Sequence, residues 1–199
     1  LKNNFKKVFS LAMQGQSSAQ YQLGVFYEVG EGIESDFDEA LNWYRRAADL
    51  GHSDAQLALG THYYDGSKVD KDYLRAEKWL TLAAENGNVE AQHNLGLFYA
   101  DSEHKFQNDD LALAWLKASS EQGMLISNVA IGDYYREVKL DNIEARHWYI
   151  KASDKGNAAA QQRLGDLYRL GLGVSVDYAS AMRWYSVSAD QFNAQSMFE

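Results

Sequence analysis

Residues 17–52 read SSAQYQLGVFYEVGEGIESDFDEALNWYRRAADLGH, and this stretch holds a set of markers that recurs along the chain. Its tryptophan, Trp43, is the first of the five tryptophans in the sequence. They are spaced by 36, 36, 33 and 36 residues, at Trp43, Trp79, Trp115, Trp148 and Trp184. A fixed period in this range is typical of proteins built from one repeated helical or strand-containing unit. The sequence is therefore predicted to form a repeat array.

Two further sets of markers follow the same period. Each unit has a glycine after an aliphatic residue and a tyrosine three positions later, at Gly24/Tyr27, Gly60/Tyr63, Gly96/Tyr99, Gly132/Tyr135 and Gly165/Tyr168. Each unit also has Asp or Asn four positions before an alanine, at Asp36, Asp72, Asn108, Asp141 and Asp177. The glycines are spaced by 36, 36, 36 and 33 residues, whereas the tryptophans show the short interval one step earlier. The fourth unit is therefore predicted to have a shortened loop between Tyr135 and Asp141.

Each unit is predicted to contain two antiparallel helices. In the first helix, Leu23 and Tyr27 share one face, and Gly24 allows a neighbouring helix to approach closely. Asp36 is suited to cap the second helix, and Gly51 is suited to the left-handed residue that ends it. The five tryptophans are expected to be core residues, so that Trp115→Ala would cost about 3–5 kcal/mol of stability.

The motif Ala19-Gln20-x-x-Leu23-Gly24-x-x-Tyr27, followed by Gly30-x-Gly32, Asp36, Ala40, Trp43 and Gly51, resembles the Sel1-like repeat, a relative of the tetratricopeptide repeat. The Ala-Gln pair recurs at Gln56, Gln92 and Gln161, whereas the fourth unit has Ser127-Asn128 instead. The resemblance implies an all-α, right-handed superhelical solenoid of antiparallel helix pairs. It divides a single repeat domain, 1–199, into a partial repeat at 1–16, repeats at 17–52, 53–88, 89–124, 125–157 and 158–191, and the start of another at 192–199.

Both ends of the sequence fall inside a repeat. Phe5–Gly15 resembles the second helix of a preceding unit, and Phe192–Phe198 resembles a first helix that has just begun. A repeat array without polar caps exposes apolar ends. We therefore expect a piece of a longer protein that can associate with itself through these ends. Bacterial periplasm or envelope and cytoplasm both remain open as its location.

Composition and charge narrow the classes of partner. The net charge is −9, and no Lys/Arg stripe is present, so a nucleic-acid backbone would be repelled. The sequence has no run of 18 apolar residues, so no membrane insertion is expected. It has no cysteine, and its five histidines show no metal-binding spacing. We therefore expect no metal site, no cofactor and no catalytic residues.

By resemblance to the tetratricopeptide arrangement, the first helices line a concave groove that binds a protein or peptide. The amino-terminal part of this groove is predicted to be mostly apolar, and the carboxy-terminal part to carry charge. The candidate residues are Tyr21, Val25, Leu57, Tyr64, His93 and Leu97 in the first part, and Asp133, Arg136, Arg163, Asp166 and Arg169 in the second. The loop at Glu103–Gln107, which lacks the usual glycines, is a secondary candidate for binding.

The charged half of the groove has two interpretations. One is that Arg136, Arg163 or Arg169 holds an acidic group of the partner. The other is that Arg163, Asp166 and Asp133 pair with one another on a solvated face, where such pairs contribute about 0–1 kcal/mol each.

Three classes of function follow. A protein-binding adaptor or scaffold is favoured, because the recurring residues are all explained by packing and because the resemblance implies such a role. A self-associating structural spacer is the first alternative. The second is a regulatory module, with any enzyme activity residing in a domain outside this sequence.

Overall fold

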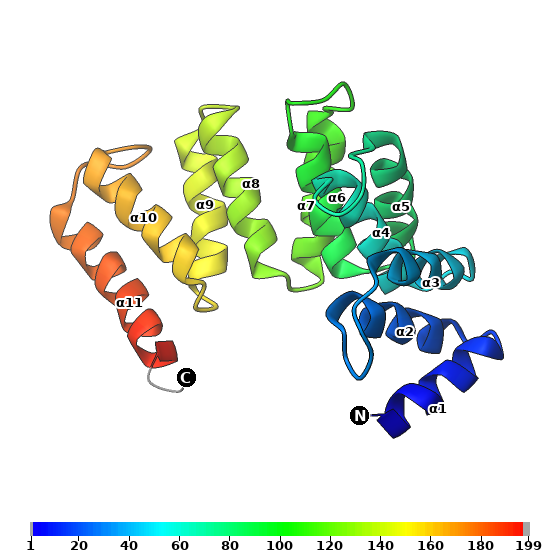
Figure 1. Cartoon of the computed structure of the whole chain (residues 1–199). Helices are drawn as coiled ribbons and strands as arrows, with labels where there is room; N and C mark the ends of the chain where they lie inside the picture. The colour runs from blue at the N-terminus through cyan, green and yellow to red at the C-terminus, as the bar shows by residue number, and fades with distance from the viewer. Residues whose placement is uncertain (1, 197–199) are drawn as a thin grey trace. The chain divides into compact units, whose positions relative to one another are not determined.

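The computed structural model describes the backbone of residues 2–196 and the side chains of residues 4–190. Eleven α-helices follow one another along this part of the chain (Figure 1). They are α1 (Lys2–Met13), α2 (Ser17–Val29), α3 (Phe37–Asp49), α4 (Ser53–Asp65), α5 (Tyr73–Glu85), α6 (Val89–Ala100), α7 (Asp109–Glu121), α8 (Leu125–Glu137), α9 (Asn142–Ser153), α10 (Ala158–Leu170) and α11 (Tyr178–Ser196). The predicted all-α architecture of consecutive helix pairs is confirmed.

The helices belong to two compact units. The first unit ends at Gln107 and contains α1 to α6, and the second begins at Asn108 and contains α7 to α11. In the first unit α2 packs against α3 and α4 against α5, and in the second α8 packs against α9 and α10 against α11. In these four repeats the two helices thus cover each other's apolar faces. In the described part of the chain, no helix has the length and apolar character needed to cross a membrane.

The predicted caps are present at the second helices. The Asp36 carboxylate accepts a hydrogen bond of 3.1 Å from the Glu39 backbone N–H. Asp72, Asn108, Asp141 and Asp177 cap the later second helices in the same way. Gly51 adopts a φ of 82° after α3, a conformation that costs glycine little because it has no Cβ. These local signals fix where each second helix begins and ends.

The tryptophans are less buried than predicted, except for the first. Trp43 is 5% exposed and packs against Phe9, with the ring centroids 6.4 Å apart. Trp79, Trp115, Trp148 and Trp184 are only half-buried. These four are therefore not fully buried, although Trp184 packs against the core cluster of the second unit. Some of their rings lie under cations instead, as where Lys78 Nζ is 4.7 Å from the Trp79 ring centroid.

The deeper core position is the residue after the tryptophan. Tyr44, Leu80, Leu116 and Tyr149 are each at most 2% exposed. The side chains of Tyr44, Leu80 and Tyr149 occupy the space left by the glycine of the first helix. A Cβ at Gly24 would lie 2.6 Å from the Tyr44 ring, and one at Gly60 would lie 2.7 Å from Leu80 Cγ. The recurring glycine therefore makes room for this residue rather than for the tryptophan.

In the first three repeats, the glutamine of the Ala-Gln pair joins the repeat to the helix before it. Gln20, Gln56 and Gln92 are buried, and their side-chain amides donate to the backbone carbonyls of Ala12, Ala48 and Ala84 at 3.1–3.2 Å. In the fourth repeat the shorter Asn128 side chain bonds instead with the Ser120 hydroxyl. The second side-chain bond there, Ser127 to Ser119 at 2.9 Å, completes this substitute contact.

The shortened loop of the fourth repeat lies between α8 and α9. It contains no glycine, and Leu140 adopts a φ of 54°, in the left-handed region that a branched side chain disfavours. The sequence predicts a new first helix from residue 192, whereas α11 continues without a break through Ser196. Residues 197–199, the rest of that predicted helix, lie outside the described residues.

Candidate functional site

The predicted groove residues of the first unit lie on α2, α4 and α6. Tyr21, Val25, Leu57 and Tyr64 are half-buried, His93 is buried, and Leu97 is exposed. Burial lowers the pKa of His93, which favours its neutral form. These residues share the predicted helices but do not all meet at one site.

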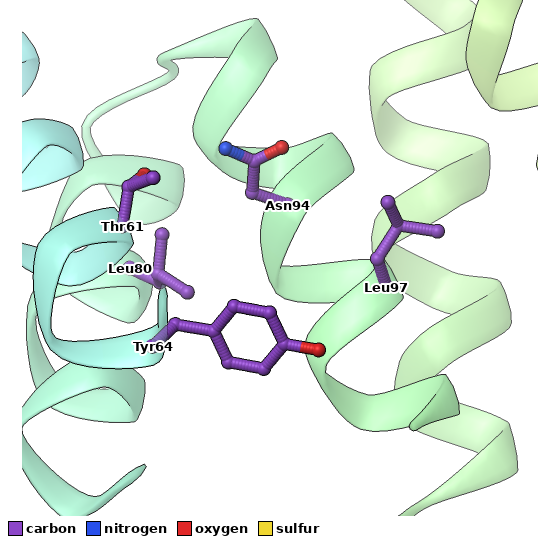
Figure 2. A pocket seen from close by; sticks show the side chains of 5 residues that line it. All are labelled: Thr61, Tyr64, Leu80, Asn94 and Leu97. Carbon is purple, nitrogen blue, oxygen red and sulfur yellow. The ribbon is translucent and has the colours of Figure 1, made fainter. Parts of the chain in front are cut away.

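Tyr64 and Leu97 meet in a pocket of about 150 Å³, which we call the apolar pocket. It is lined by Thr61 and Tyr64 of α4, Leu80 of α5, and Asn94 and Leu97 of α6. In Figure 2 the Tyr64 ring extends from α4 toward α6, which carries Asn94 and Leu97. Tyr21, Val25, Leu57 and His93 are not among its lining residues.

The identity of the residue after the tryptophan explains why the pocket forms here. In the first repeat this residue is Tyr44, whose ring lies over Gly24 and whose hydroxyl donates to Glu28 at 2.6 Å. In the second repeat it is Leu80, which lies over Gly60 and ends at its Cδ atoms. A leucine leaves unfilled the space that the outer half of a tyrosine ring occupies. Because Leu80 lines the apolar pocket, we infer that the pocket is this space.

Tyr64, which forms one wall of the apolar pocket, is held in place by contacts of its hydroxyl and of its ring. The Tyr64 hydroxyl donates to the Asp101 carboxylate at 2.7 Å, and partial burial together with this bond raises the pKa of Tyr64. Its ring packs against Phe98 at 5.9 Å and Tyr73 at 6.0 Å. Because Tyr64 is fixed at both ends, it forms a preformed wall of the pocket.

The loop after α6 is anchored to this aromatic cluster. His104 is buried, with its ring centroid 4.3 Å from Phe98 and 4.5 Å from Tyr73. Its Nδ1 accepts a hydrogen bond of 3.2 Å from the Phe106 backbone N–H. Within the predicted binding loop Glu103–Gln107, the two rings thus face inward, while Glu103, Lys105 and Gln107 are exposed.

Polar residues occupy the equivalent surface of the first repeat. Glu28 accepts hydrogen bonds from Tyr44 at 2.6 Å and from Lys68 at 2.8 Å, and His62 Nε2 lies 3.5 Å from it. Although partial burial opposes ionisation, these donors hold the pKa of Glu28 below its ordinary value. Tyr21 is engaged nearby, with its ring stacked on His52 at 4.9 Å.

In the second unit, three side chains, two of them predicted groove residues, meet at the carboxylate of Asp133. Arg163 donates to both carboxylate oxygens of Asp133, from Nε at 2.9 Å and from Nη2 at 3.3 Å. Tyr149 donates to the same carboxylate at 2.7 Å, and Arg136 lies 3.5 Å from it. Arg136 also pairs with Glu137. We call this set the Asp133 network.

Asp166 forms a second, smaller group. It accepts a hydrogen bond of 2.7 Å from Tyr185 and lies 3.4 Å from Arg169, which also donates to the Tyr185 hydroxyl at 3.2 Å. The predicted pairing of Arg163 with Asp133 across the repeat boundary is present, whereas Asp166 pairs with Arg169 rather than with Arg163. All three arginines thus have carboxylate partners within the chain.

Sequence reasoning did not single out the residues that organise both surfaces. The position after the tryptophan reads Tyr44, Leu80, Leu116, Tyr149 and Tyr185 along the five repeats. Where it is tyrosine in the described contacts, the hydroxyl reaches a carboxylate, as in Tyr44 to Glu28, Tyr149 to Asp133 and Tyr185 to Asp166. The alternation between tyrosine and leucine at this position was the available signal. Among the described residues, no group of three or more His, Asp or Glu side chains is placed to hold a metal ion.

Comparisons with known proteins agree on the architecture. The chain is similar to a protective antigen of uropathogenic Escherichia coli that displays this repeat fold, with 34% identity and a TM-score of 0.85. The match covers 94% of this chain and 41% of the Escherichia coli chain, so the present chain spans about two-fifths of that relative. A Sel1 repeat protein of Oxalobacter formigenes shows 31% identity and a TM-score of 0.79, over 96% of this chain and 79% of its own.

A more distant match shares the fold. The immunity protein Pa5087 of Pseudomonas aeruginosa has 23% identity and a TM-score of 0.58, over 94% of this chain and 72% of its own. No match was found among curated proteins. The Sel1 repeat model matches residues 17–52, 53–88, 89–124, 128–157 and 158–191. The chain therefore belongs to the Sel1 repeat family.

Proposed function

We propose that the chain is a non-enzymatic scaffold that binds a protein or peptide partner on the first helices of its first unit. The observation that carries this proposal is the apolar pocket between α4, α5 and α6. The pocket holds an apolar side chain of the partner against Leu80, Leu97 and the Tyr64 ring.

The size and chemistry of the pocket suit one side chain. A cavity of about 150 Å³ with apolar walls is large enough for a benzene-sized group. Complete burial of a leucine, phenylalanine or similar side chain stabilises a complex by about 1.5–3 kcal/mol. Leu97 is 42% exposed in the free chain and loses contact with water when the pocket is filled.

Polar groups beside the pocket give the partner an orientation. Thr61 and Asn94, which carry a hydroxyl and an amide, are both among its lining residues. Both groups donate and accept hydrogen bonds, and a peptide backbone offers the complementary N–H and C=O groups. A few placed polar groups around an apolar pocket are typical of selective binding sites.

In this proposal the Asp133 network has a structural role. Arg163 already donates to both oxygens of Asp133, and Arg169 is paired with Asp166. An acidic partner group would have to compete with these internal carboxylates. The proposal therefore assigns apolar recognition to Tyr64 and Leu97, and it assigns the positioning of α8, α9 and α10 to Asp133 and Arg163.

The test is selection of a random peptide library on the wild-type protein, followed by measurement of the selected peptides on variants. Leu80→Tyr fills the pocket with the side chain that the array itself uses at Tyr44, Tyr149 and Tyr185. Leu97→Glu places a charge at its rim. We expect both variants to weaken binding about tenfold or more, which is about 1.4 kcal/mol.

The control is Leu111→Glu, because Leu111 is 39% exposed, close to the 42% of Leu97, and lies on a second helix. It should change affinity less than about twofold. Selected peptides that bind Leu80→Tyr and Leu97→Glu as tightly as wild type would overturn the proposal. A mass that rises with concentration and that Leu97→Glu restores to the monomer would identify a second copy of the chain as the occupant.

A further inference from the structure

A second depression in the first unit lies on different residues from the apolar pocket. It has a volume of about 300 Å³ and is lined by Arg45 and Asp49 of α3, Tyr63 of α4, and Arg75, Lys78 and Trp79 of α5. We call it the cationic pocket. We propose that it binds a carboxylate of an acidic segment of the protein partner, a statement that rests on the proposed function because it assumes such a partner.

Aromatic rings hold the three cations in place. Arg45 Nη2 donates to the Tyr63 hydroxyl at 3.0 Å, and the Arg75 guanidinium carbon lies 5.3 Å from the centroid of the same ring. Lys78 Nζ lies 4.7 Å from the Trp79 ring centroid. Such contacts orient a cation without neutralising its charge. Two guanidinium groups thus converge on Tyr63.

The pocket retains positive charge. Among the described residues, Arg45 and Lys78 form no ion pair with a carboxylate, whereas Arg75 pairs with Asp72 at 3.2 Å. Asp49 is the negative residue of the lining. Three cations against Asp49 and Asp72 leave one positive charge (3 − 2 = 1), in a chain whose net charge is −9. This differs from the Asp133 network, where the arginines already have carboxylate partners.

Tyr63 adds a hydrogen-bond donor. Its side chain is 4% exposed, and its hydroxyl accepts the bond from Arg45. No acceptor for the hydroxyl proton is found among the described contacts of Tyr63. A buried hydroxyl that accepts from a cation and has an unused proton is suited to donate to an anion in the pocket. One carboxylate oxygen then bonds to Tyr63 while the guanidinium groups supply charge.

The repeats themselves show that this arrangement is specific to one junction. Counting from the tryptophans identifies the equivalent positions in the other repeats. Arg45 lies two residues after Trp43, whereas Arg75 lies four residues and Lys78 one residue before Trp79. The equivalent residues are Thr81, Leu111 and Ala114 at the next junction, then Lys117, Glu144 and His147, then Ile150, Ser180 and Arg183. The repeat fold forms at the two junctions of the second unit without three cations, so the fold does not depend on a cation at each of these positions.

The charge favours a carboxylate over a phosphate. One residual positive charge matches the single negative charge of an aspartate or glutamate side chain, whereas a phosphate monoester carries about −1.5 to −2 near pH 7. The overall charge of −9 also repels a polyanion. An acidic residue of a partner segment meets both conditions.

The test is nuclear magnetic resonance titration of the whole chain with a blocked tetra-glutamate peptide and, separately, with a blocked tetra-glutamine peptide. The reporters are the Arg45 and Arg75 Nε–H signals and the Trp79 indole N–H signal. We expect tetra-glutamate to shift these signals and to bind about tenfold more tightly than tetra-glutamine, with an affinity that falls as salt is added. Inorganic phosphate is titrated as a third probe.

The variant is Arg45→Gln/Lys78→Gln, and its control is Lys117→Gln/Arg183→Gln, which removes the same charge from equivalent positions in other repeats. We expect the first pair to weaken tetra-glutamate binding about tenfold and the control pair to leave it unchanged within about twofold. Lys78→Gln alone and Tyr63→Phe, each checked by circular dichroism, keep the test valid if the double variant does not fold.

Four results would overturn the inference: no shift with tetra-glutamate, equal affinity for tetra-glutamine, equal affinity of the double variant, or tighter binding of inorganic phosphate than of the peptide. These results are distinct from failure of the proposed function. If tetra-glutamate fails while Leu80→Tyr still weakens the selected library peptides, the carboxylate site is wrong and the scaffold proposal stands.

Discussion

The Tyr149 hydroxyl and the Arg163 guanidinium donate to one carboxylate, that of Asp133, from two different repeats. Tyr149 belongs to α9 of the fourth repeat, and Arg163 belongs to α10 of the fifth. The contact therefore joins a buried ring to the surface of the next repeat. It stabilises the stacking of these two repeats and keeps Arg163 from serving other anions.

Removal of the Tyr149 hydroxyl should lower stability and weaken the Arg163 contact. We expect Tyr149→Phe to cost about 1 kcal/mol in the free energy of unfolding, as loss of one hydrogen bond typically does. In a double-mutant cycle with Arg163→Gln, urea denaturation should give a coupling energy of about 0.5 kcal/mol or more. The same cycle with Arg183→Gln, which contacts Ser180 instead, should give no coupling. Additive effects of Tyr149→Phe and Arg163→Gln would contradict the shared-carboxylate account.

Loss of the buried glutamine amide should weaken the contact between adjacent repeats and lower stability. Gln92→Met keeps the side-chain length but removes the amide donor to the Ala84 carbonyl, which retains a backbone bond from the Gly87 N–H. We expect the loss of this one hydrogen bond to cost about 0.5–1.5 kcal/mol. Gln162→Met is the control, because Gln162 is exposed. The two midpoints of chemical denaturation are compared, and equal midpoints would show that the amide contributes nothing.

The Glu28 contacts should make stability depend on pH. Because the folded-state pKa of Glu28 is lowered, its stabilising contribution is present above the unfolded-state pKa and is lost as the pH falls through the folded-state pKa. Glu28→Gln should therefore be less stable than wild type at pH 7, by about 0.5–1.5 kcal/mol. The difference should shrink as the pH falls below the ordinary Glu pKa. A difference that is constant from pH 7 to strongly acidic conditions would exclude a role for the charge.

The tryptophans should differ in how much each contributes to the free energy of unfolding. Trp43→Ala removes a side chain that is 5% exposed and should cost about 3–5 kcal/mol. Trp115 is half-buried, so Trp115→Ala should cost less, about 1–3 kcal/mol. Guanidinium denaturation of both variants gives the comparison. A larger loss for Trp115→Ala would restore the expectation that all five tryptophans are core residues.

Much of the fold could be predicted because its signals are local. Asp36 and Gly51 act on backbone groups within a few residues, so their positions in the sequence were enough to place the ends of α3. It was harder to predict from the sequence which side chains are most deeply buried. Trp43 and Tyr44 are about 100° apart around their helix, and the sequence does not show which of them faces the glycine of the partner helix.

The candidate site was only partly predictable. Tyr64 and Leu97 were identified through their positions on first helices, but the pocket between them also depends on Leu80, which lies on a second helix. The pairing of Arg163 with Asp133 rather than Asp166 depends on the reach of a flexible side chain across a repeat boundary. Arg45, Tyr63 and Arg75 come from three helices, and periodicity does not show that they converge.

The choice between Tyr44 and Leu80 also has a consequence for how such proteins diversify. Both side chains fit over a glycine of the first helix, and both leave the helix lengths and the repeat period unchanged. A single substitution at this column therefore opens or fills the space over the glycine without any insertion or deletion. An array of this kind can relocate its recognition point from one repeat to another while the order of its helices stays the same.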